Sequence, residues 1–225
     1  HPEYRRQRQM CIRDRFYCYP NSFTDEVLEV MASDPRFCRY LDMPFQHISD
    51  PVLKKMNRKI TRKEIEATMA RVRRKLPDVA WRTTFIVGFP TETDQDFEEL
   101  VDFVSEGHCQ HLGIFLYSDE DNIRSSKFGD PIPLSLKEER KNRLMEIQQK
   151  ISREHHQKMV GSLQQVLVGG FSSETDLLLE GRNQYQGPEV DGVVYINEGN
   201  ATSAGFHQVE ITEAHEYDLV GKILN

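Results

Sequence analysis

Apolar runs and amphipathic stretches alternate along the first two-thirds of the chain. Short runs of β-branched and aromatic residues predict strands over residues 16–19, 39–45, 81–88 and 111–118. Helical spacing of apolar residues predicts helices over residues 24–32, from 50, over 61–76 and from 93. Thr61 and Glu64 have the spacing of a capping box at the third of these helices. Because strands and helices follow one another in turn, the pattern favours an α/β fold with a parallel sheet and helices outside it.

A long helix is expected next, from Ser135 to about Met159, because Ser135 and Glu138 again form a capping box. One stripe of this helix is apolar and is predicted to be its packing face. The stripe comprises Leu144, Ile147 and Ile151. The adjacent pair His155 and His156 is expected to be solvated.

The pattern of apolar and polar residues changes after Gly161, where short apolar runs are separated by Gly, Asn, Ser and Pro. The runs cover residues 163–171, 177–182, 193–197, 208–214 and 218–224. Such spacing predicts a small antiparallel, OB-like β-barrel. We therefore expect an α/β domain with its connecting helix over residues 16–157 and a barrel over 158–225. Residues 1–15 have no apolar periodicity and are expected to be a non-native or disordered leader, with a native basic arm as the alternative.

The charge is distributed unevenly along the chain, whose net charge is −7. Residues 1–15 carry a net +3, residues 16–157 a net −3, and residues 158–225 a net −7, from three basic and ten acidic residues. An acidic barrel should attract a basic partner and repel nucleic acid. No apolar stretch approaches the roughly 18 residues of a membrane span, and no signal-peptide pattern opens the chain, so the expected location is the cytoplasm.

The four cysteines offer no ready metal or cluster site. Cys11, Cys18, Cys38 and Cys109 lack both CxxC and CxxxCxxC spacing, so we interpret them as reduced, mostly buried thiols. The segment GHCQH, residues 107–111, has metal-like composition. It falls at a helix-to-strand junction, on the sheet edge opposite the expected site, and no metal site is assigned to it.

Polar residues follow the second predicted strand, in the segment from Leu41 to Arg58. In barrels of parallel strands the carboxyl edge carries the active site. Gln46, His47 and Ser49 could hydrogen-bond a polar ligand there, and Arg58 could hold a carboxylate in a bidentate pair. A polar loop that merely caps a helix is an equally good interpretation of the residues alone.

The third predicted strand ends in a second candidate loop, from Arg82 to Thr93. Gly88 would allow a sharp turn or a close approach of the backbone to a ligand. Phe89 and Pro90 could form an apolar wall for a flat ring. The alternative is an ordinary strand-to-helix turn with a good cap.

Both loops together resemble a known family. PFQHISDPVLKKMNR (44–58) and RTTFIVGFPTETDQDF (82–97) are similar to the second half of the radical S-adenosylmethionine (SAM) core of methylthiotransferases. EERKNRLMEIQQKIS (138–152) resembles their connecting helix, and residues from about Lys158 look like their TRAM domain. GRNQYQGPEVDGVVYIN (181–197) and EYDLVGKIL (216–224) resemble the RimO type. The resemblance covers about residues 16–225.

The resemblance implies the second half of a parallel, TIM-like radical SAM barrel followed by a TRAM barrel. It implies SAM and two 4Fe-4S clusters as cofactors of the full-length enzyme. The family's cluster-binding cysteines, including its CxxxCxxC loop, are not found in this sequence, so we expect no cluster on this chain and no activity from it alone. No catalytic residue is assigned. The residues expected at the cofactor pocket are Gln46, His47, Ser49, Arg58, Thr84, Val87, Gly88 and Phe89.

The resemblance further implies insertion of a methylthio group at the β-carbon of an aspartate in a small-subunit ribosomal protein, which would be the basic partner. A first alternative is a tRNA-modifying methylthiotransferase of the N6-isopentenyladenosine type. The acidic barrel makes RNA the less expected partner. A second alternative is a non-catalytic binding module on an α/β scaffold.

Overall fold

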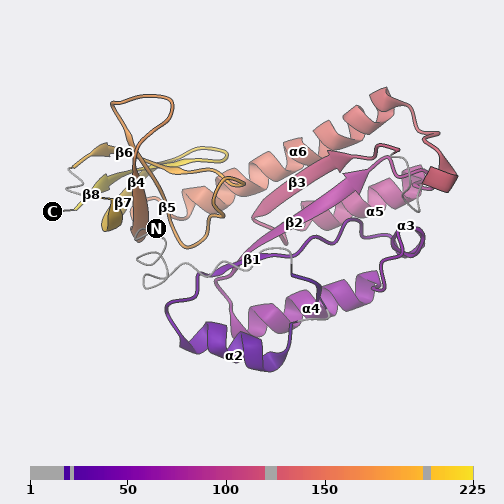
Figure 1. Cartoon of the computed structure of the whole chain (residues 1–225), viewed down its shortest axis with the longest axis horizontal. Coiled ribbons are helices and arrows are strands. Elements are labelled where there is room, and N and C mark those ends of the chain that lie inside the picture. Colours follow the sequence, from indigo (N-terminus) through magenta and orange to yellow (C-terminus); the bar gives the residue numbers. More distant parts are fainter. Residues whose placement is uncertain (1–17, 21–22, 120–125, 200–203, 225) are drawn as a thin grey trace, which may run out of the picture. The chain divides into compact units, whose positions relative to one another are not determined.

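The structure is a computed structural model that describes residues 18–20, 23–119, 126–199 and 204–224 (Figure 1). These residues form two compact units. The α/β unit contains the described residues of 18–37 and 41–148, and the barrel unit contains those of 38–40 and 149–224. The expected leader, residues 1–15, lies outside the described residues. Among the helices described, none is long and apolar enough to cross a membrane.

The helices and strands agree in order with the predicted alternation. In chain order they are α2 (Asp25–Ser33), β1 (Tyr40–Asp42), α3 (Asp50–Lys55), α4 (Arg62–Lys75), β2 (Ala80–Val87), α5 (Asp94–Ser105), β3 (His111–Leu116), the 3-10 helix η2 (Ser126–Phe128), α6 (Leu134–Gln157), β4 (Leu163–Phe171), β5 (Leu179–Arg182), β6 (Val194–Glu198), β7 (Gly205–Ala214) and β8 (Leu219–Ile223).

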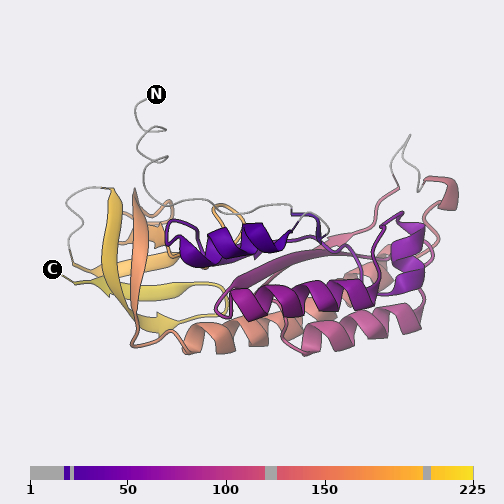
Figure 2. The same ribbon diagram turned by 90° about the horizontal axis from the view of Figure 1, so that it is seen from below.

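The α/β unit is built on a sheet with the strand order β1-β2-β3. β2 and β3 run parallel, with Arg82 opposite His111 and Val87 opposite Leu116. Beyond the end of β1, an isolated parallel bridge joins Gln46 to Phe85. Figure 2 shows α4 and α5 along one side of this sheet. The predicted parallel sheet with external helices is therefore confirmed for the part of the chain that the structure describes.

Burial alternates along β2 and distinguishes the two faces of the sheet. The residues from Trp81 onward at odd numbers are buried, whereas Arg82, Thr84 and Ile86 are half-exposed. Phe85 contacts Phe103 of α5 edge to face, with ring centroids 6.0 Å apart. Burying such a side chain contributes about 1.5–3 kcal/mol. On β2, one face is thus covered by helices, while the side chains of the other face are half-exposed.

β1 is shorter than the strand predicted over residues 39–45. Pro44 has no N–H to donate to a neighbouring strand, and Thr83 compensates with its side chain. Its hydroxyl accepts a hydrogen bond from the Phe45 amide (3.2 Å) and donates one to the Met43 carbonyl (2.9 Å). Backbone pairing resumes at Gln46, whose amide donates to the Thr84 carbonyl at 2.8 Å.

The strand predicted over residues 16–19 is wrong where it can be checked. Its first two residues lie outside the described part of the chain, and Cys18 and Tyr19 belong to no strand. The Cys18 amide nevertheless donates to the Asp42 carbonyl at 2.9 Å. This single backbone hydrogen bond does not make Cys18 part of a strand.

α6 starts at Leu134, so the capping box predicted at Ser135 is wrong. The Pro133 carbonyl accepts hydrogen bonds from the amides of Leu136 (3.1 Å) and Lys137 (3.2 Å), which places the first turn ahead of Ser135. Proline suits this position because its fixed φ is compatible with a helix start.

The packing face of α6 is more polar than the predicted apolar stripe. Leu144 is fully buried, but Ile147 and Ile151 are only half-buried. The buried polar residues of α6 are Lys137, Arg140, Gln148, Ser152 and His156. The expectation that His156 is solvated is therefore wrong. Its Nδ1 lies 3.1 Å from the His215 carbonyl oxygen, which agrees with the rule that buried polar groups find partners.

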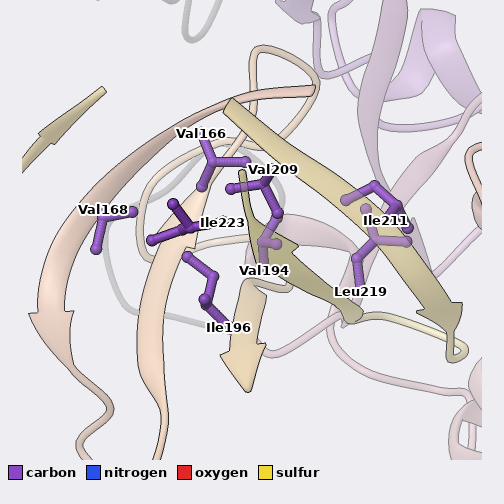
Figure 3. Close-up of a cluster of buried hydrophobic side chains, with 8 residues drawn as sticks. All are labelled: Val166, Val168, Val194, Ile196, Val209, Ile211, Leu219 and Ile223. Atoms are coloured by element: carbon purple, nitrogen blue, oxygen red, sulfur yellow. The ribbon is translucent and has the colours of Figure 1, made fainter. Parts of the chain in front are cut away.

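The barrel unit is a closed ring of strands in the order β4-β5-β6-β8-β7. Its interior is filled by eight apolar side chains that point toward one another (Figure 3). The prediction of an all-antiparallel barrel is wrong in one pair, because β6 and β8 run parallel. A closed ring with an odd number of strands cannot alternate direction all the way round, so one parallel pair is required.

Candidate functional site

Gln46 marks the carboxyl edge of the sheet, where the loops after β1 and β2 meet. Its amide donates to the Thr84 carbonyl and its carbonyl accepts from the Ile86 amide, both at 2.8 Å. Its φ is +75°, in the left-handed region. For a residue other than glycine this conformation costs of order 1–3 kcal/mol and is concentrated at functional sites. The half-exposed Gln46 side chain is therefore held at the edge at an energetic cost.

Thr84 lies on the accessible face of β2, next to Gln46 in the backbone ladder. It is paired with Gly113 of β3. A Cβ at position 113 would lie 3.4 Å from both Thr84 Oγ1 and Arg82 Nη2. The absence of a side chain at Gly113 thus leaves room for these two polar groups on the accessible face.

His47 and Ser49 are brought together, but beneath the loop surface. Both are fully buried. His47 Nδ1 accepts a hydrogen bond from the Ser49 amide at 3.0 Å, and Nε2 lies 3.8 Å from Glu92 Oε2. Burial lowers the pKa of His47 to about 4; Asp96 opposes this shift and Arg140 reinforces it. The ring is therefore neutral at pH 7, with its proton on Nε2.

Asp96 connects the first loop to the start of α5. Ser49 Oγ donates to Asp96 Oδ1, while Oδ2 accepts from the Thr93 amide (2.9 Å) and hydroxyl (2.6 Å). Thr93 and Asp96 thus form a capping box for α5. Burial acts to raise the pKa of Asp96, but the hydrogen bonds from Ser49 and Thr93 lower it overall. Asp96 is an ionised anchor for both loops.

Glu92 fixes the turn after β2 in the same way. Its Oε2 accepts from the amides of Gly88 (2.7 Å) and Phe89 (3.2 Å), and its Oε1 accepts from Arg140 at 2.8 Å. Burial raises the pKa of Glu92, and the Arg140 charge and the two amides act in the opposite direction. Arg140 also binds the exposed Asp94 at 2.6 Å. This buried pair joins α6 to the turn.

Gly88 makes a sharp turn, as predicted, with φ +75°. The space beside it is already occupied by this chain. A Cβ at Gly88 would overlap the stem of Lys137 and lie only 2.7 Å from its Cδ. Lys137 is itself buried and donates to the Tyr117 carbonyl (2.8 Å) and to Asp130 (2.5 and 2.6 Å). Approach of a ligand to Gly88 therefore stays a prediction.

Phe89 and Val87 are buried rather than lining an open surface. Phe89 packs edge to face on Tyr117 and Phe128, at centroid distances of 5.3 and 6.1 Å. Val52 of α3 belongs to the same apolar cluster. Phe89 thus packs against other apolar side chains of the chain, and its role as a wall for a flat ring stays a prediction.

Arg58 lies apart from the other candidates. Its guanidinium carbon is 5.7 Å from the centre of the Tyr19 ring. It is half-exposed, and its role toward a ligand carboxylate stays a prediction.

The His and Cys residues of segment 107–111 have contacts within the chain that account for them without a metal ion. His108 contacts Arg73 and Glu106. Burial raises the pKa of the Cys109 thiol to about 12, which makes it unreactive. Among the residues that the structure describes, no group of three or more His, Cys, Asp and Glu side chains is placed to hold a metal ion.

Four charged residues of the network were not among the predicted site residues: Glu92, Asp96, Lys137 and Arg140. Asp96 had a local signal, since it follows Thr93 at capping-box spacing. Lys137 and Arg140 reach the turn from α6, more than forty residues further along the chain. Their neighbours in sequence are those of an ordinary charged helix, so no local signal identifies them.

Two family models match the chain. A model of the radical SAM superfamily matches residues 3–104, and a model of the TRAM domain matches residues 160–224.

Curated relatives match over nearly the whole chain. A ribosomal protein uS12 methylthiotransferase RimO from Desulfotalea psychrophila is 46% identical over 93% of this chain and 47% of its own length. Proteins of the same name from Bdellovibrio bacteriovorus and Geobacter sulfurreducens are 48% and 42% identical, over 92% and 93% of this chain and 46% and 47% of their own lengths. The chain thus spans about half the length of these relatives. Over that span it is similar to RimO-type methylthiotransferases, with a radical SAM match followed by a TRAM match.

Proposed function

We propose that the chain is part of a radical SAM methylthiotransferase that inserts a methylthio group at the β-carbon of an aspartate in ribosomal protein uS12. The observation that carries the proposal is the identity of 46% over 93% of the chain to a uS12 methylthiotransferase. In this family SAM and 4Fe-4S clusters supply the radical and sulfur-insertion chemistry. Among the described residues no group of three or more His, Cys, Asp and Glu side chains is placed to hold a metal ion, so we derive no step through a cluster.

The proposed cofactor contact is the accessible edge formed by Gln46 and Thr84. Both side chains are half-exposed and polar, and the Gln46 amide donates to the carbonyl of Thr84, which lies within β2. They fit the hydrogen-bonding groups of a nucleoside better than do the buried His47, Ser49, Val87 and Phe89. We propose that the buried candidates act by positioning, because Glu92 and Asp96 bind both loops into one network.

The proposed partner, a basic ribosomal protein, fits the surface of the barrel. None of its ten acidic residues is buried. Lys222 pairs with Glu210 at 3.3 Å and Arg153 with Glu216 at 3.2 Å. A net negative surface favours uS12 over tRNA as the molecule that this unit recognises. We also propose a cytoplasmic location and domain limits at 16–157 and 158–225.

A chimera tests the proposed function. Residues 16–225 would replace the corresponding part of the Geobacter sulfurreducens relative, and the purified chimera would be reconstituted with iron and sulfide under anaerobic conditions. With SAM and a reductant it should add one methylthio group to uS12, detected by mass spectrometry of the modified peptide. Modification of tRNA instead would favour the tRNA-modifying alternative. A folded, cluster-loaded chimera that modifies neither would favour a binding module.

Variants of the chimera test the proposed edge. Gln46→Ala and Thr84→Val should raise the SAM concentration needed for half-maximal rate. Gln184→Ala is the matched control, because Gln184 is exposed in the barrel unit. Equal behaviour of all three variants would contradict the assignment of Gln46 and Thr84.

A further inference from the structure

The chain contains a short segment whose charge is opposite to that of the whole. Residues 54–63, KKMNRKITRK, carry six Lys and Arg and no Asp or Glu, whereas the chain has a net charge of −7. The segment covers the end of α3, the loop after it and the start of α4. Runs rich in Lys and Arg are typical of nucleic-acid contacts but are also common on solvated helix faces. The structure helps to distinguish these cases.

The segment meets a further lysine from another part of the chain. Lys55 Nζ lies 5.7 Å and Lys127 Nζ 5.0 Å from the centre of the same Phe128 ring. Figures 1 and 2 both show α3 beside η2, which carries Lys127 and Phe128. We name as the basic rim the exposed lysines of these two regions. They are Lys54, Lys55, Lys59, Lys63 and Lys127.

The lysines of the basic rim have no acidic partners among the described residues, whereas three other basic residues of α4 are paired. There, Arg62 pairs with Glu66, Arg71 with Asp25 and Lys75 with Glu29. The dipole of α3 accounts for Lys54 and Lys55 in its last turn. It does not account for the other three lysines.

Two described acidic residues next to the elements of the basic rim have partners elsewhere. Asp50 accepts a hydrogen bond from the Arg62 amide at 2.7 Å, and Asp130 binds the buried Lys137. Uncompensated like charges raise the free energy of the folded chain. A polyanion that follows the basic rim would relieve this repulsion.

We infer that the basic rim binds the phosphate backbone of RNA. The clustered ammonium groups supply the electrostatic attraction, and the half-exposed Phe128 ring between two of them is a surface on which a base can stack. α3 follows the loop after β1, so the basic rim lies at the carboxyl ends of the strands, beside the proposed cofactor edge. Positive charge there would repel a free basic protein. This inference rests on the proposed function. It implies that the chain binds uS12 while uS12 is associated with ribosomal RNA.

The test measures binding of the full chain to fluorescently labelled small-subunit ribosomal RNA by anisotropy at several salt concentrations. The variant Lys55→Glu/Lys59→Glu/Lys127→Glu should bind at least about tenfold more weakly. The slope of log affinity against log salt should become shallower by about 2, because each lost phosphate contact removes about 0.7. The control is Lys141→Glu/Lys150→Glu/Lys158→Glu, which changes the net charge equally and should retain most of the affinity. Circular dichroism would verify folding, and a Lys→Gln version of the triple variant should show a smaller loss in the same direction.

Competitors separate the possible partners. Polyglutamate that displaces the RNA at equal charge concentration would overturn the inference in favour of an acidic protein. Equal loss of affinity in the control would also overturn it. Preference for tRNA over ribosomal RNA would keep the RNA contact but contradict the link to uS12. Absence of RNA binding would refute the basic rim as an RNA site and leave the methylthiotransferase proposal intact.

Discussion

At the scale of single residues, Gly88 carries two constraints, a left-handed backbone and a close neighbour. Its φ is +75°, and the stem of Lys137 occupies the place of a side chain. Gly88→Ala should therefore lower the free energy of unfolding by more than the roughly 1–3 kcal/mol of backbone strain alone. Urea denaturation of the wild type and the variant measures the difference.

Gly129 provides the matched control for this comparison. Its φ is +64°, but nothing lies within 4 Å of its hypothetical Cβ. Gly129→Ala should thus show the backbone cost without the overlap. If the free energy of unfolding falls equally in both variants, Lys137 adapts to the added methyl group and the close contact does not contribute to the loss.

His47 should make stability depend on pH. Its folded pKa of about 4 lies below the value of about 6.5 for an unfolded histidine, because burial disfavours the charged ring. The unfolded state therefore binds more protons between these values, and the free energy of unfolding should fall as pH falls from 6.5 to 4, by an amount of order 3 kcal/mol. The same titration of His47→Asn should be flatter.

The half-exposed His207 of the barrel unit is the control for His47. His207→Asn should keep the slope of the wild type between pH 6.5 and 4. Subtracting each variant from the wild type removes the contributions of titrating groups that do not interact with the replaced histidine. Parallel curves for wild type and His47→Asn would show that folding does not lower the pKa of His47.

At the scale of elements, α6 is attached to the turn after β2 by the buried pair of Arg140 and Glu92. Arg140→Met should lower the free energy of unfolding by about 3–5 kcal/mol, because it leaves a buried carboxylate without its partner. The double variant Arg140→Met/Glu92→Gln should recover part of that loss. A double-mutant cycle measured by urea denaturation gives the coupling.

Arg143 lies one turn further along α6 and pairs with Glu98 at the surface, where both side chains are about half exposed. Arg143→Met should therefore cost no more than about 1 kcal/mol. A loss as large as that of Arg140→Met would mean that α6 is held by its overall charge and not by the buried pair.

The elements that the sequence predicts well are those with local signals. The Thr61–Glu64 capping box starts α4 as expected, and the β-branched run of β2 ends before Gly88 as expected. The errors have non-local causes. β1 is shortened by Pro44 and completed by the Thr83 hydroxyl, which comes from another strand. The parallel β6–β8 pair follows from closure of the ring, and no single strand carries that information.

The candidate site was predictable in part for the same reason. The end of β1 is visible in the pattern, so Gln46 could be selected, and the β-branched run of β2 marks the strand that contains Thr84. The buried state of His47 and Ser49 depends on Glu92 and Asp96 folding back over them. The contact of Lys137 with Gly88 depends on the path of α6. These contacts are decided by tertiary packing, which a hydrophobic pattern does not encode.

At the scale of the whole molecule, charge is partitioned between the units. If uS12 is the partner, as proposed, its binding to the full chain should weaken as salt rises, because the acidic barrel unit would attract it electrostatically. Glu189→Gln/Glu198→Gln/Glu213→Gln removes three exposed acidic groups of the barrel unit and should mainly slow association. Surface plasmon resonance at several salt concentrations measures this effect.

The control neutralises three exposed acidic groups of α6 in the α/β unit, as Glu138→Gln/Glu139→Gln/Glu146→Gln. It changes the net charge equally and should leave the association rate nearly unchanged. If both triple variants slow association alike, the overall charge attracts uS12 and the barrel has no special part.

The closed ring of β4, β5, β6, β8 and β7 also has a consequence for hydrogen exchange. Each strand is bonded on both sides, so no strand can detach without breaking two ladders at once. The free energy needed to detach one strand is then close to the free energy needed to open the whole barrel unit. The backbone amides of all five strands should exchange with deuterium through one shared opening event, so that their protection rises and falls together. A graded order of exchange from strand to strand would mean that the ring opens at a seam, and the parallel β6–β8 pair is where that seam would be expected.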